Sequence, residues 1–329
     1  MSGADPGGGI AVAIVSFESA RFLGACLDAL AAQSAPPAEV VVVDNASRDG
    51  SAEIARRHRV VSRVEASAAN VGFAAGQNRA IGLTRSPWVL TLNPDVVLGE
   101  GFLAVLGARA RAADVRLGTL CGKLLRLGDD LRPVDPPLID STGIVFTRAF
   151  RHLDRGSGDL DRGQWEREEQ VFGASAAAAL YRRDMIEDVA IGGEFFDEAF
   201  FAYREDADVA WRARLFGWDC LYVPSAVGYH VRRVLPERRR ELPAMLNRHS
   251  VKNRFLMRIK NADAAVWRRC GARGALRDAA VVGGCLFREW SSLPALVDVA
   301  RLWPRARLQR REIQTRRRRS GDDIARWFE

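Results

Sequence analysis

The stretch IAVAIVSFESARFLGACLDALAAQSAPPAEVVVVDNAS, residues 10–47, decides the fold class of this chain. It begins with a nearly continuous apolar run rich in β-branched residues, Ile10 to Phe17, which predicts a strand buried on both faces. Apolar residues then recur at helical spacing from Ala20 to Gln33, and two adjacent prolines follow. A second buried strand is expected at Glu39 to Val43. The stretch therefore predicts a strand, a helix and a second strand.

The same alternation continues along the chain. Further helices are expected at Ser51 to Arg57 and Ala74 to Thr84, and further strands at Val60 to Glu65 and Trp88 to Asp95. Strands that alternate with helices imply parallel pairing with right-handed crossovers. We therefore expect a doubly wound, mostly parallel α/β sheet.

The second half of the chain changes character twice. Residues Asp129 to Gln170 are polar and irregular, and we interpret them as long loops near an acceptor site. A helix at Glu205 to Phe216 and a strand at Cys220 to His230 follow. Beyond Pro236 the sequence is helical in pattern and basic.

Composition restricts the class of protein. A chain of 329 residues with 48% hydrophobic residues can form one large core with an appendage. Its five cysteines are scattered and never form C-x-x-C, which argues against a disulfide framework or a zinc site and favours a reducing compartment. Neither a signal sequence nor a run of eighteen apolar residues is visible, so we expect a cytoplasmic protein without a membrane span.

The formal charge of +8 is concentrated near the C-terminus. The arginines there are Arg301, Arg305, Arg307, Arg310, Arg311 and the run Arg316 to Arg319. An acidic partner is expected, and charge alone leaves nucleic acid and an anionic membrane surface open. The alternative is a solvated tail without a partner.

Three polar clusters follow predicted strands, at Ser16 to Glu18, Asp44 to Ser47 and Asn93 to Asp95. In doubly wound sheets the ligand lies beyond the carboxyl ends of the strands. The three clusters are therefore expected to meet at one edge of the sheet and to form a ligand site.

Two of these clusters carry specific candidates. Asp44 can accept hydrogen bonds from a pyrimidine imide or a ribose hydroxyl, although it could instead cap the next helix. Asp95 can hold Mg²⁺ or Mn²⁺ against a diphosphate, although Asn-Pro-Asp is also good turn chemistry.

The segment REDAD, Arg204 to Asp208, supplies candidates for a catalytic base. A carboxylate must accept the proton of an attacking hydroxyl, and we favour Asp206 with Glu205 as the next choice. The alternative is that these acids only complement a helix dipole. His230 could complete a cation's coordination or contact a diphosphate, although a solitary histidine is more often structural.

Taken together, these pieces resemble the family 2 glycosyltransferases of the GT-A fold, and more narrowly their bacterial rhamnosyltransferase-like branch. The resemblance covers roughly residues 10–235 and is carried by VVVVDNASRDGS, ANVGFAAGQNRAI, VLTLNPDV, GGEFFDEAFFAYREDADVAWRARLFGW and YVPSAVGYH. The metal-binding D-x-D of the family appears here as Asn93-Pro94-Asp95. One departure is GGEFFDE, where the usual text is closer to GGFDE.

The resemblance implies a role for each matching position. It implies a GT-A domain at residues 10–235, preceded by a flexible start at 1–9 and followed by a helical, Arg-rich extension at 236–329. The implied donor-nucleotide residues are Ser16, Phe17, Glu18, Asp44, Asn70, Gly72, Asn78 and Asn93. Asp95 and His230 would hold Mg²⁺ or Mn²⁺, and Asp206 would act as base. Transfer would proceed with inversion and without a covalent intermediate, from dTDP-rhamnose or a UDP-linked donor.

Rival functions fit the sequence less well. A nicotinamide-dependent oxidoreductase needs G-x-G-x-x-G after its first strand, whereas Gly7 to Gly9 precede it. A non-catalytic nucleic-acid- or membrane-binding protein leaves Asp95, Asp206 and His230 without a role.

We expect a glycan or polyprenyl-diphosphate-linked acceptor, no nucleic acid, and peripheral attachment at the inner face of the cell membrane. There the arginine tail would meet anionic lipids beside Phe287, Trp290 and Trp303.

Overall fold

The computed structural model describes residues 9–232, 244–287 and 289–329. The flexible start was expected at residues 1–9, of which 1–8 lie outside the described residues. The expected boundary between residues 235 and 236 also lies outside them.

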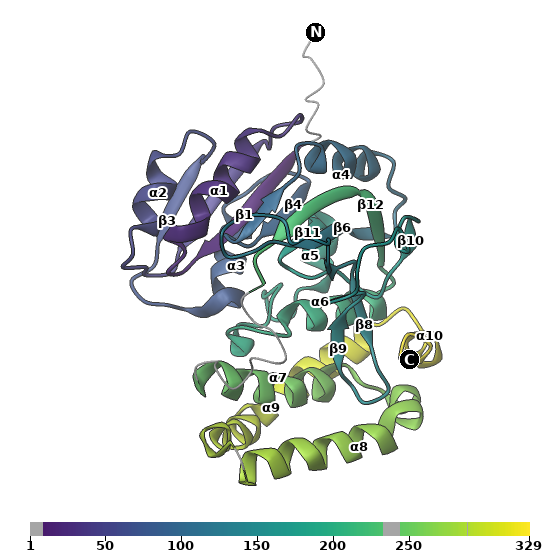
Figure 1. The fold of residues 1–329 in the computed structure, drawn as a ribbon. Helices are drawn as coiled ribbons and strands as arrows, with labels where there is room; N and C mark the ends of the chain where they lie inside the picture. Colours follow the sequence, from purple (N-terminus) through teal and green to yellow (C-terminus); the bar gives the residue numbers. More distant parts are fainter. Residues whose placement is uncertain (1–8, 233–243, 288) are drawn as a thin grey trace.

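The first half of the chain forms the predicted alternation of strands and helices (Figure 1). Four parallel strands lie side by side in the order β3-β2-β1-β4: β1 (Ile10–Ser16), β2 (Glu39–Asp44), β3 (Arg63–Ala66) and β4 (Trp88–Leu92). The helices between them are α1 (Ala20–Ala31), α2 (Ser51–Arg57) and α3 (Gly72–Gly82). The third strand begins three residues later than expected, because His58 to Val61 form a turn closed by the Val61 amide on the His58 carbonyl.

The second half of the sheet is mixed in direction. In the order β4-β11-β6-β12-β10, strand β11 runs antiparallel to both of its neighbours and β12 runs parallel to β6. These strands are β6 (Leu117–Arg126), β10 (Glu169–Gln170), β11 (Ala178–Arg182) and β12 (Asp219–His230). The short strands β5 (Val96–Leu98) and β7 (Ile139–Ser141) pair with β12 and β6.

The segment expected to be only loops contains regular structure, so that expectation was wrong. Besides β7 and β10 it contains the hairpin of β8 (Ile144–Phe146) and β9 (His152–Asp154). The strands are two or three residues long, too short for a periodicity signal. In Figure 1 this hairpin reaches down from the sheet toward the C-terminal helices.

Two hydrophobic cores lie on the two faces of the sheet. Ile10, Val12 and Ile14 of β1 pack with α1 and with α4 (Phe102–Arg111), whereas Ala13 faces the other core. That other core contains α3, α5 (Arg183–Val189) and α6 (Glu205–Leu215). A short 3-10 helix, η1 (Glu198–Phe200), precedes α6.

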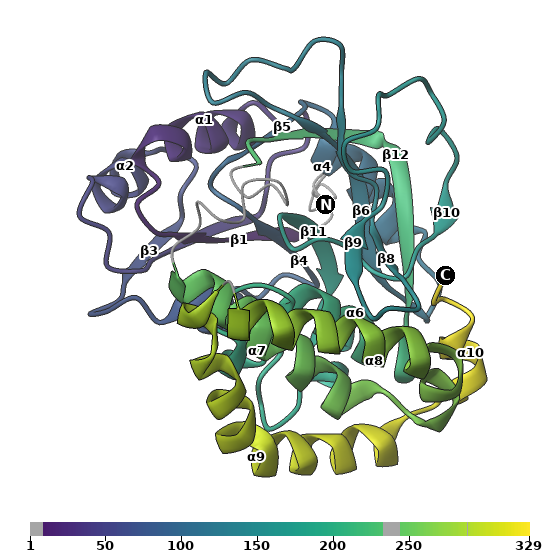
Figure 2. The ribbon, with the colours of Figure 1, turned by 60° about the horizontal axis from the view of Figure 1, so that its bottom comes forward.

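The C-terminal residues form four α-helices and a 3-10 turn, η3, within the described part of the chain: α7 (Ala244–Asn261), α8 (Ala264–Phe287), η3 (Trp290–Ser292), α9 (Pro294–Arg316) and α10 (Gly321–Ala325). Figure 2 shows them gathered on one side of the sheet, and α7 packs against both α6 and α9. Phe328 is fully buried, with its ring 5.1 Å from that of Phe146 and 5.0 Å from that of Trp211. The C-terminus therefore completes the core beneath β8 and α6. None of the described helices is long and apolar enough to span a bilayer.

Candidate active site

The polar clusters that follow β1, β2 and β4 meet at one edge of the sheet, as predicted. Ser16 and Asp44 are register partners on the adjacent strands β1 and β2. Asp44 accepts a hydrogen bond from the Ser47 amide through Oδ2 at 3.1 Å. Its Oδ1 and the Ser16 hydroxyl are buried and have no hydrogen-bond partner among the described residues. Buried polar atoms without partners are costly, so these two point to a polar ligand at this edge.

The other predicted nucleotide residues differ in their present contacts. Phe17 is half exposed at the same edge, and Glu18 has a φ of 49° and accepts the Arg48 amide at 2.8 Å. Asn70 accepts the amide of Gly72 at 2.9 Å. Gly72 has a φ of +86° and packs so closely on Phe201 that a Cβ would lie 2.6 Å from its ring and its carbonyl oxygen.

Asn78 already uses both ends of its side-chain amide. It donates to the Phe196 carbonyl at 2.8 Å and accepts the Phe196 amide at 2.9 Å. It thereby ties α3 to the GGEFFDE segment that precedes the catalytic helix. Its predicted contact with the donor remains a prediction.

Asp95 and His230 are brought together by strand pairing. Strand β12 runs antiparallel to β5 with His230 opposite Val96, so the imidazole lies beside the residue before β5. The distance from His230 Nε2 to Asp95 Oδ1 is 3.4 Å. On its other side, His230 Nδ1 lies 2.8 Å from Asp140 Oδ2 on β7. Although burial lowers the pKa of His230, the carboxylates of Asp140 and Asp95 raise it to about 10.

The REDAD segment forms the first turn of α6, and its three acids have different surroundings. Asp208 is fully buried and ion-paired with Lys260 at 2.9 Å and Arg212 at 3.0 Å, so it is structural. Asp206 accepts the amides of Ala207 and, more weakly, Ala176. Glu205 Oε2 is buried, and no residue in the described part of the chain forms a hydrogen bond with it.

Burial and neighbouring charge raise the pKa values of both remaining acids. The pKa of Asp206 is raised to about 6, first by burial and then by the charge of Asp154. The pKa of Glu205 is raised further by burial and by Asp206. Asp206 is therefore the carboxylate that is ionised near neutral pH yet poised to accept a proton, as a general base requires.

One cavity of about 370 Å³ contains these groups. Asp95 and His230 line it together with Asp206 and Glu205, and Asn93 contributes from the end of β4. The Asp95 carboxylate, the His230 imidazole and the Asp206 carboxylate with its raised pKa thus face one space, which suits a reaction that releases an anion and a proton.

Comparison with known proteins decides the family. The glycosyl transferase family 2 model matches residues 11–190. This chain belongs to glycosyl transferase family 2. The transferase is also 31% identical to the N-acetylglucosaminyl-diphospho-decaprenol L-rhamnosyltransferase of Mycobacterium tuberculosis over 247 residues, which span 67% of this chain and 75% of that protein. Glycosyl transfer is therefore the activity of this chain.

Solved glycosyltransferases share the fold of the transferase at low identity. GalNAc-T7 with UDP, GalNAc and Mn²⁺ matches with a TM-score of 0.60 and 11% identity over 78% of this chain and 49% of that one. Staphylococcus aureus TarS matches with a TM-score of 0.57 and 19% identity over 90% of this chain and 49% of that one. Pyrobaculum calidifontis mannosyltransferase PcManGT with GDP-Man and Mn²⁺ matches with a TM-score of 0.52 and 18% identity over 96% of this chain and 85% of that one. The match spans about half the length of the GalNAc-T7 and TarS chains.

Sequence reasoning missed several charged residues that line or support this cavity. Asp154 and Arg232 line it, and Arg232 forms ion pairs with both Asp154 and Asp140. A continuous series of charged side chains therefore joins His230 to Asp154, the residue that raises the pKa of Asp206. Asp140 and Asp154 lie in the segment that was expected to be loops. Only the pairing of β7 with β6 and of β9 with β8 could have placed these two residues.

The described residues near Asp95 fit a divalent cation that shares its ligands with substrate. Asp95 Oδ1 is buried without a hydrogen-bond donor, and His230 Nε2 is next to it. Among the described residues no group of three or more His, Cys, Asp or Glu side chains forms a complete metal site. Mg²⁺ commonly binds through one or two carboxylates with waters and substrate phosphates, which matches this donor set. Asp140 would orient His230 from behind.

Helix α7 holds the loop that leads into the catalytic helix. Phe201, Tyr203 and Arg204 all have φ values between 65° and 71°, which is unusual for residues other than glycine. The Asn253 amide nitrogen donates to the carbonyls of Phe200, Ala202 and Tyr203 at 2.8 to 3.0 Å. Part of the predicted extension therefore supports the loop that borders the candidate site.

The terminal arginine run contacts the protein itself rather than standing free. Arg316 donates to the carbonyls of Ala190 and Asp188, and the next three residues form ion pairs: Arg317 with Asp263, Arg318 with Asp188, and Arg319 with Asp219. The expectation that this run serves as the lipid-binding tail does not agree with these contacts.

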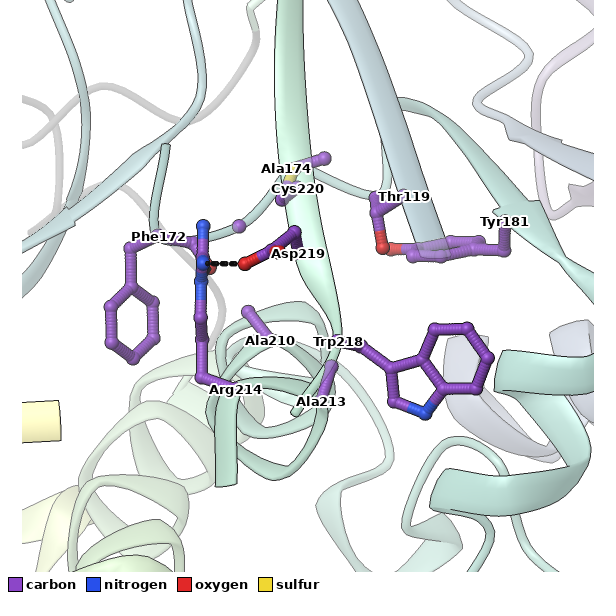
Figure 3. A pocket seen from close by; sticks show the side chains of 11 residues that line it. Thr119, Phe172, Ala174, Tyr181, Ala210, Ala213, Arg214, Trp218, Asp219 and Cys220 are labelled. Atoms are coloured by element: carbon purple, nitrogen blue, oxygen red, sulfur yellow. Dashed lines mark hydrogen bonds and ion pairs between the residues drawn. The ribbon is translucent and has the colours of Figure 1, made fainter. Parts of the chain in front are cut away.

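Figure 3 shows the pocket where one of these contacts is anchored. Arg214 and Asp219 point toward each other across it at 2.7 Å, and Arg319 binds the same carboxylate at 2.6 Å. Its volume of about 10 Å³ is close to that of one water probe, so it is a packing feature rather than a ligand site.

Proposed function

We propose that this chain is an inverting, metal-dependent transferase that moves a rhamnosyl unit from dTDP-rhamnose to a polyprenyl-diphosphate-linked acceptor sugar in cell-surface polysaccharide synthesis. The observation that carries the mechanism is the presence of Asp206, with its raised pKa, in the same cavity as Asp95 and His230. The M. tuberculosis relative, whose name gives both rhamnosyl transfer and a diphospho-decaprenol acceptor, supports the choice of substrates.

In the proposed reaction Asp206 accepts the proton of the acceptor hydroxyl as that oxygen attacks the anomeric carbon. The bond between that carbon and the nucleotide's phosphate oxygen breaks in the same displacement, so the configuration inverts. The nucleoside diphosphate leaves with the bonding electron pair. Asp44 and Ser16 would bind the nucleoside through their buried oxygens without partners.

Asp95 and His230 would hold Mg²⁺ or Mn²⁺ beside the leaving diphosphate. Such a cation would neutralise the charge that develops on the leaving group. His230 must lose its Nε2 proton before it can serve as a ligand, so cation binding would release a proton.

The proposed membrane contact involves a different surface from the terminal arginine run. Phe287 at the end of α8 is 82% exposed, Trp290 in η3 71% and Trp303 within α9 47%. Arg301 and Arg307 of α9 are exposed nearby. Exposed aromatics with arginines suit the interface of an anionic bilayer. Sedimentation with phosphatidylglycerol vesicles at physiological salt tests this, and absence of the protein from the pellet would contradict it.

The substrates are tested by incubating the purified full chain with Mn²⁺, a short-chain prenyl-diphospho-N-acetylglucosamine and either dTDP-rhamnose or a UDP-sugar. We expect product from dTDP-rhamnose with inverted anomeric configuration, measured by NMR. Transfer only from a UDP-sugar would overturn the donor assignment and leave the transferase assignment intact.

A further inference from the structure

A second cavity of about 120 Å³ adjoins the catalytic one and has not been used so far. The two cavities share His152 and Arg204 as walls. The remaining walls come from β9 and its preceding residue in the catalytic half, and from α7 and α8 in the C-terminal helices. The second cavity therefore exists only because the C-terminal helices pack against the hairpin.

Arginines dominate the lining of this second cavity. The side chains of Arg151, Arg204, Arg254 and Arg277 line it, and none of its lining residues is acidic. Arg254 is paired with Asp278 at 3.0 Å, but Asp278 also binds Arg258. No described residue forms an ion pair with Arg151 or Arg277. Among the described residues, Arg151 and Arg277 thus bring positive charge to the cavity that no ion pair neutralises.

The pKa of His152 is consistent with this positive charge. The pKa of this imidazole is lowered well below its usual value, first by burial and then by Arg204, Arg232, Arg151 and Arg254. Its Nδ1 lies 2.7 Å from the Arg204 guanidinium, which can only donate, so Nδ1 accepts and the ring proton is on Nε2. The wall between the cavities therefore presents the Arg204 guanidinium and the His152 ring as hydrogen-bond donors.

We infer that this second cavity is the subsite for the diphosphate of the acceptor, with Arg151 and Arg277 as its binding residues and Arg204 at the junction with the catalytic cavity. Arginine's planar donors match phosphate oxygens and bind them bidentately. This inference rests on the proposed function, because it takes a sugar diphosphate as the acceptor. The sugar would lie in the first cavity with its hydroxyl toward Asp206, and its diphosphate in the second.

The position of Val281 suggests the path of the lipid. Val281 lines the cavity one helical turn beyond Arg277 on α8, and the same helix ends at the exposed Leu286 and Phe287. A prenyl chain leaving the diphosphate along α8 would reach the exposed aromatic surface proposed to meet the bilayer. Along α8, Arg277 would thus bind the diphosphate of the acceptor, and Val281 and Phe287 would contact its prenyl chain.

The test compares two water-soluble acceptors with the same donor and the full-length chain. One is N-acetylglucosaminyl diphosphate with a ten-carbon prenyl chain, and the other is octyl N-acetylglucosaminide, which lacks the diphosphate. The Arg151→Gln, Arg277→Gln double variant should lower the preference for the diphosphate acceptor, as a ratio of kcat/KM values, by about ten-fold or more. Arg273→Gln, one turn earlier on α8 and outside the cavity lining, is the matched control and should keep the ratio.

Several outcomes would overturn the inference. An unchanged ratio, or an equal loss with both acceptors, shows that these arginines do not recognise the diphosphate. A loss of binding to phosphatidylglycerol vesicles in the double variant, with the ratio unchanged, assigns the arginines to lipid headgroups instead. No transfer by the unaltered protein to either acceptor would be a failure of the proposed function, which the wild-type reaction reveals separately.

Discussion

At the scale of single residues, the account depends most on Asp206. Its pKa is raised to about 6 by burial and by Asp154, so it is ionised at pH 7 and can accept a proton. Asp206→Asn should lower kcat by about 10²- to 10⁴-fold while leaving the affinity for the donor nucleotide nearly unchanged. Parallel turnover assays and calorimetry measure this. Near-normal turnover would reassign the base to Glu205.

The same substitution should stabilise the fold at neutral pH. A carboxyl whose folded-state pKa is raised stabilises the fold at low pH, and that stability is lost as pH rises through the folded pKa. Asp206→Asn should therefore raise the Tm above about pH 6, and the difference should vanish below about pH 4, near the unfolded pKa. Calorimetric melting across this pH range provides the check, and a lower Tm at pH 7 would contradict the assigned environment.

Asp154 provides a second test through the pH profile. Because its charge raises the pKa of Asp206, kcat/KM should fall below about pH 6. Asp154→Asn should shift this acid limb to lower pH, since removing a like charge favours ionised Asp206. A limb that stays in place or moves to higher pH would remove Asp154 from the account.

At the scale of elements, α7 is the support of the catalytic loop. Asn253→Asp keeps the side chain's shape but loses the amide donors that bind three loop carbonyls. We expect a loss of about 1–3 kcal/mol in unfolding free energy. Lower kcat and faster amide exchange around residues 200–204 should accompany it. Met245→Ala, at an exposed position of the same helix, is the control. Unchanged exchange in Asn253→Asp would show that the loop holds its own conformation.

Sequence reasoning succeeded at elements with strong periodicity and failed at short ones. The buried strand ending in Asp44 and the helix beginning at Glu205 were predicted from local pattern and lie where expected. The convergence at the sheet edge followed from parallel pairing. Asp140 and Asp154 were missed because they lie on three-residue strands, whose position depends on tertiary pairing. Arg232 acquires both of its described ion-pair partners from those strands.

At the scale of the whole molecule, the catalytic half and the C-terminal helices share a core. Phe328, next to the last residue of the chain, packs on Phe146 and Trp211 beneath the catalytic helix. Phe328→Ala should cost about 3–5 kcal/mol of unfolding free energy, as for other buried aromatics. Trp290→Ala, at an exposed position, should cost little. Equal stability of the two variants in a denaturant titration would show that the C-terminus does not support this core.

The charge distribution of the whole molecule also differs from the expectation drawn from composition. The run Arg316 to Arg319 was expected to meet an external anion, yet its side chains bind carbonyls and carboxylates of the protein. A sequence shows where charges are concentrated but not which carboxylates the fold brings to them. Arg151 and Arg277, which form no ion pair with any described residue, lie instead in the second cavity, beside the proposed acceptor.

The central claim is that a nucleoside diphosphate and a divalent cation bind together at Asp95 and His230. Isothermal titration calorimetry of dTDP, UDP and GDP against the full chain, with Mn²⁺ and again with EDTA, tests it most directly. We predict that one nucleotide binds with Mn²⁺, that EDTA weakens its binding, and that Asp95→Ala weakens binding to the same extent. Equal binding with Mn²⁺ and with EDTA, or no binding of any nucleotide to the folded protein, would contradict the account.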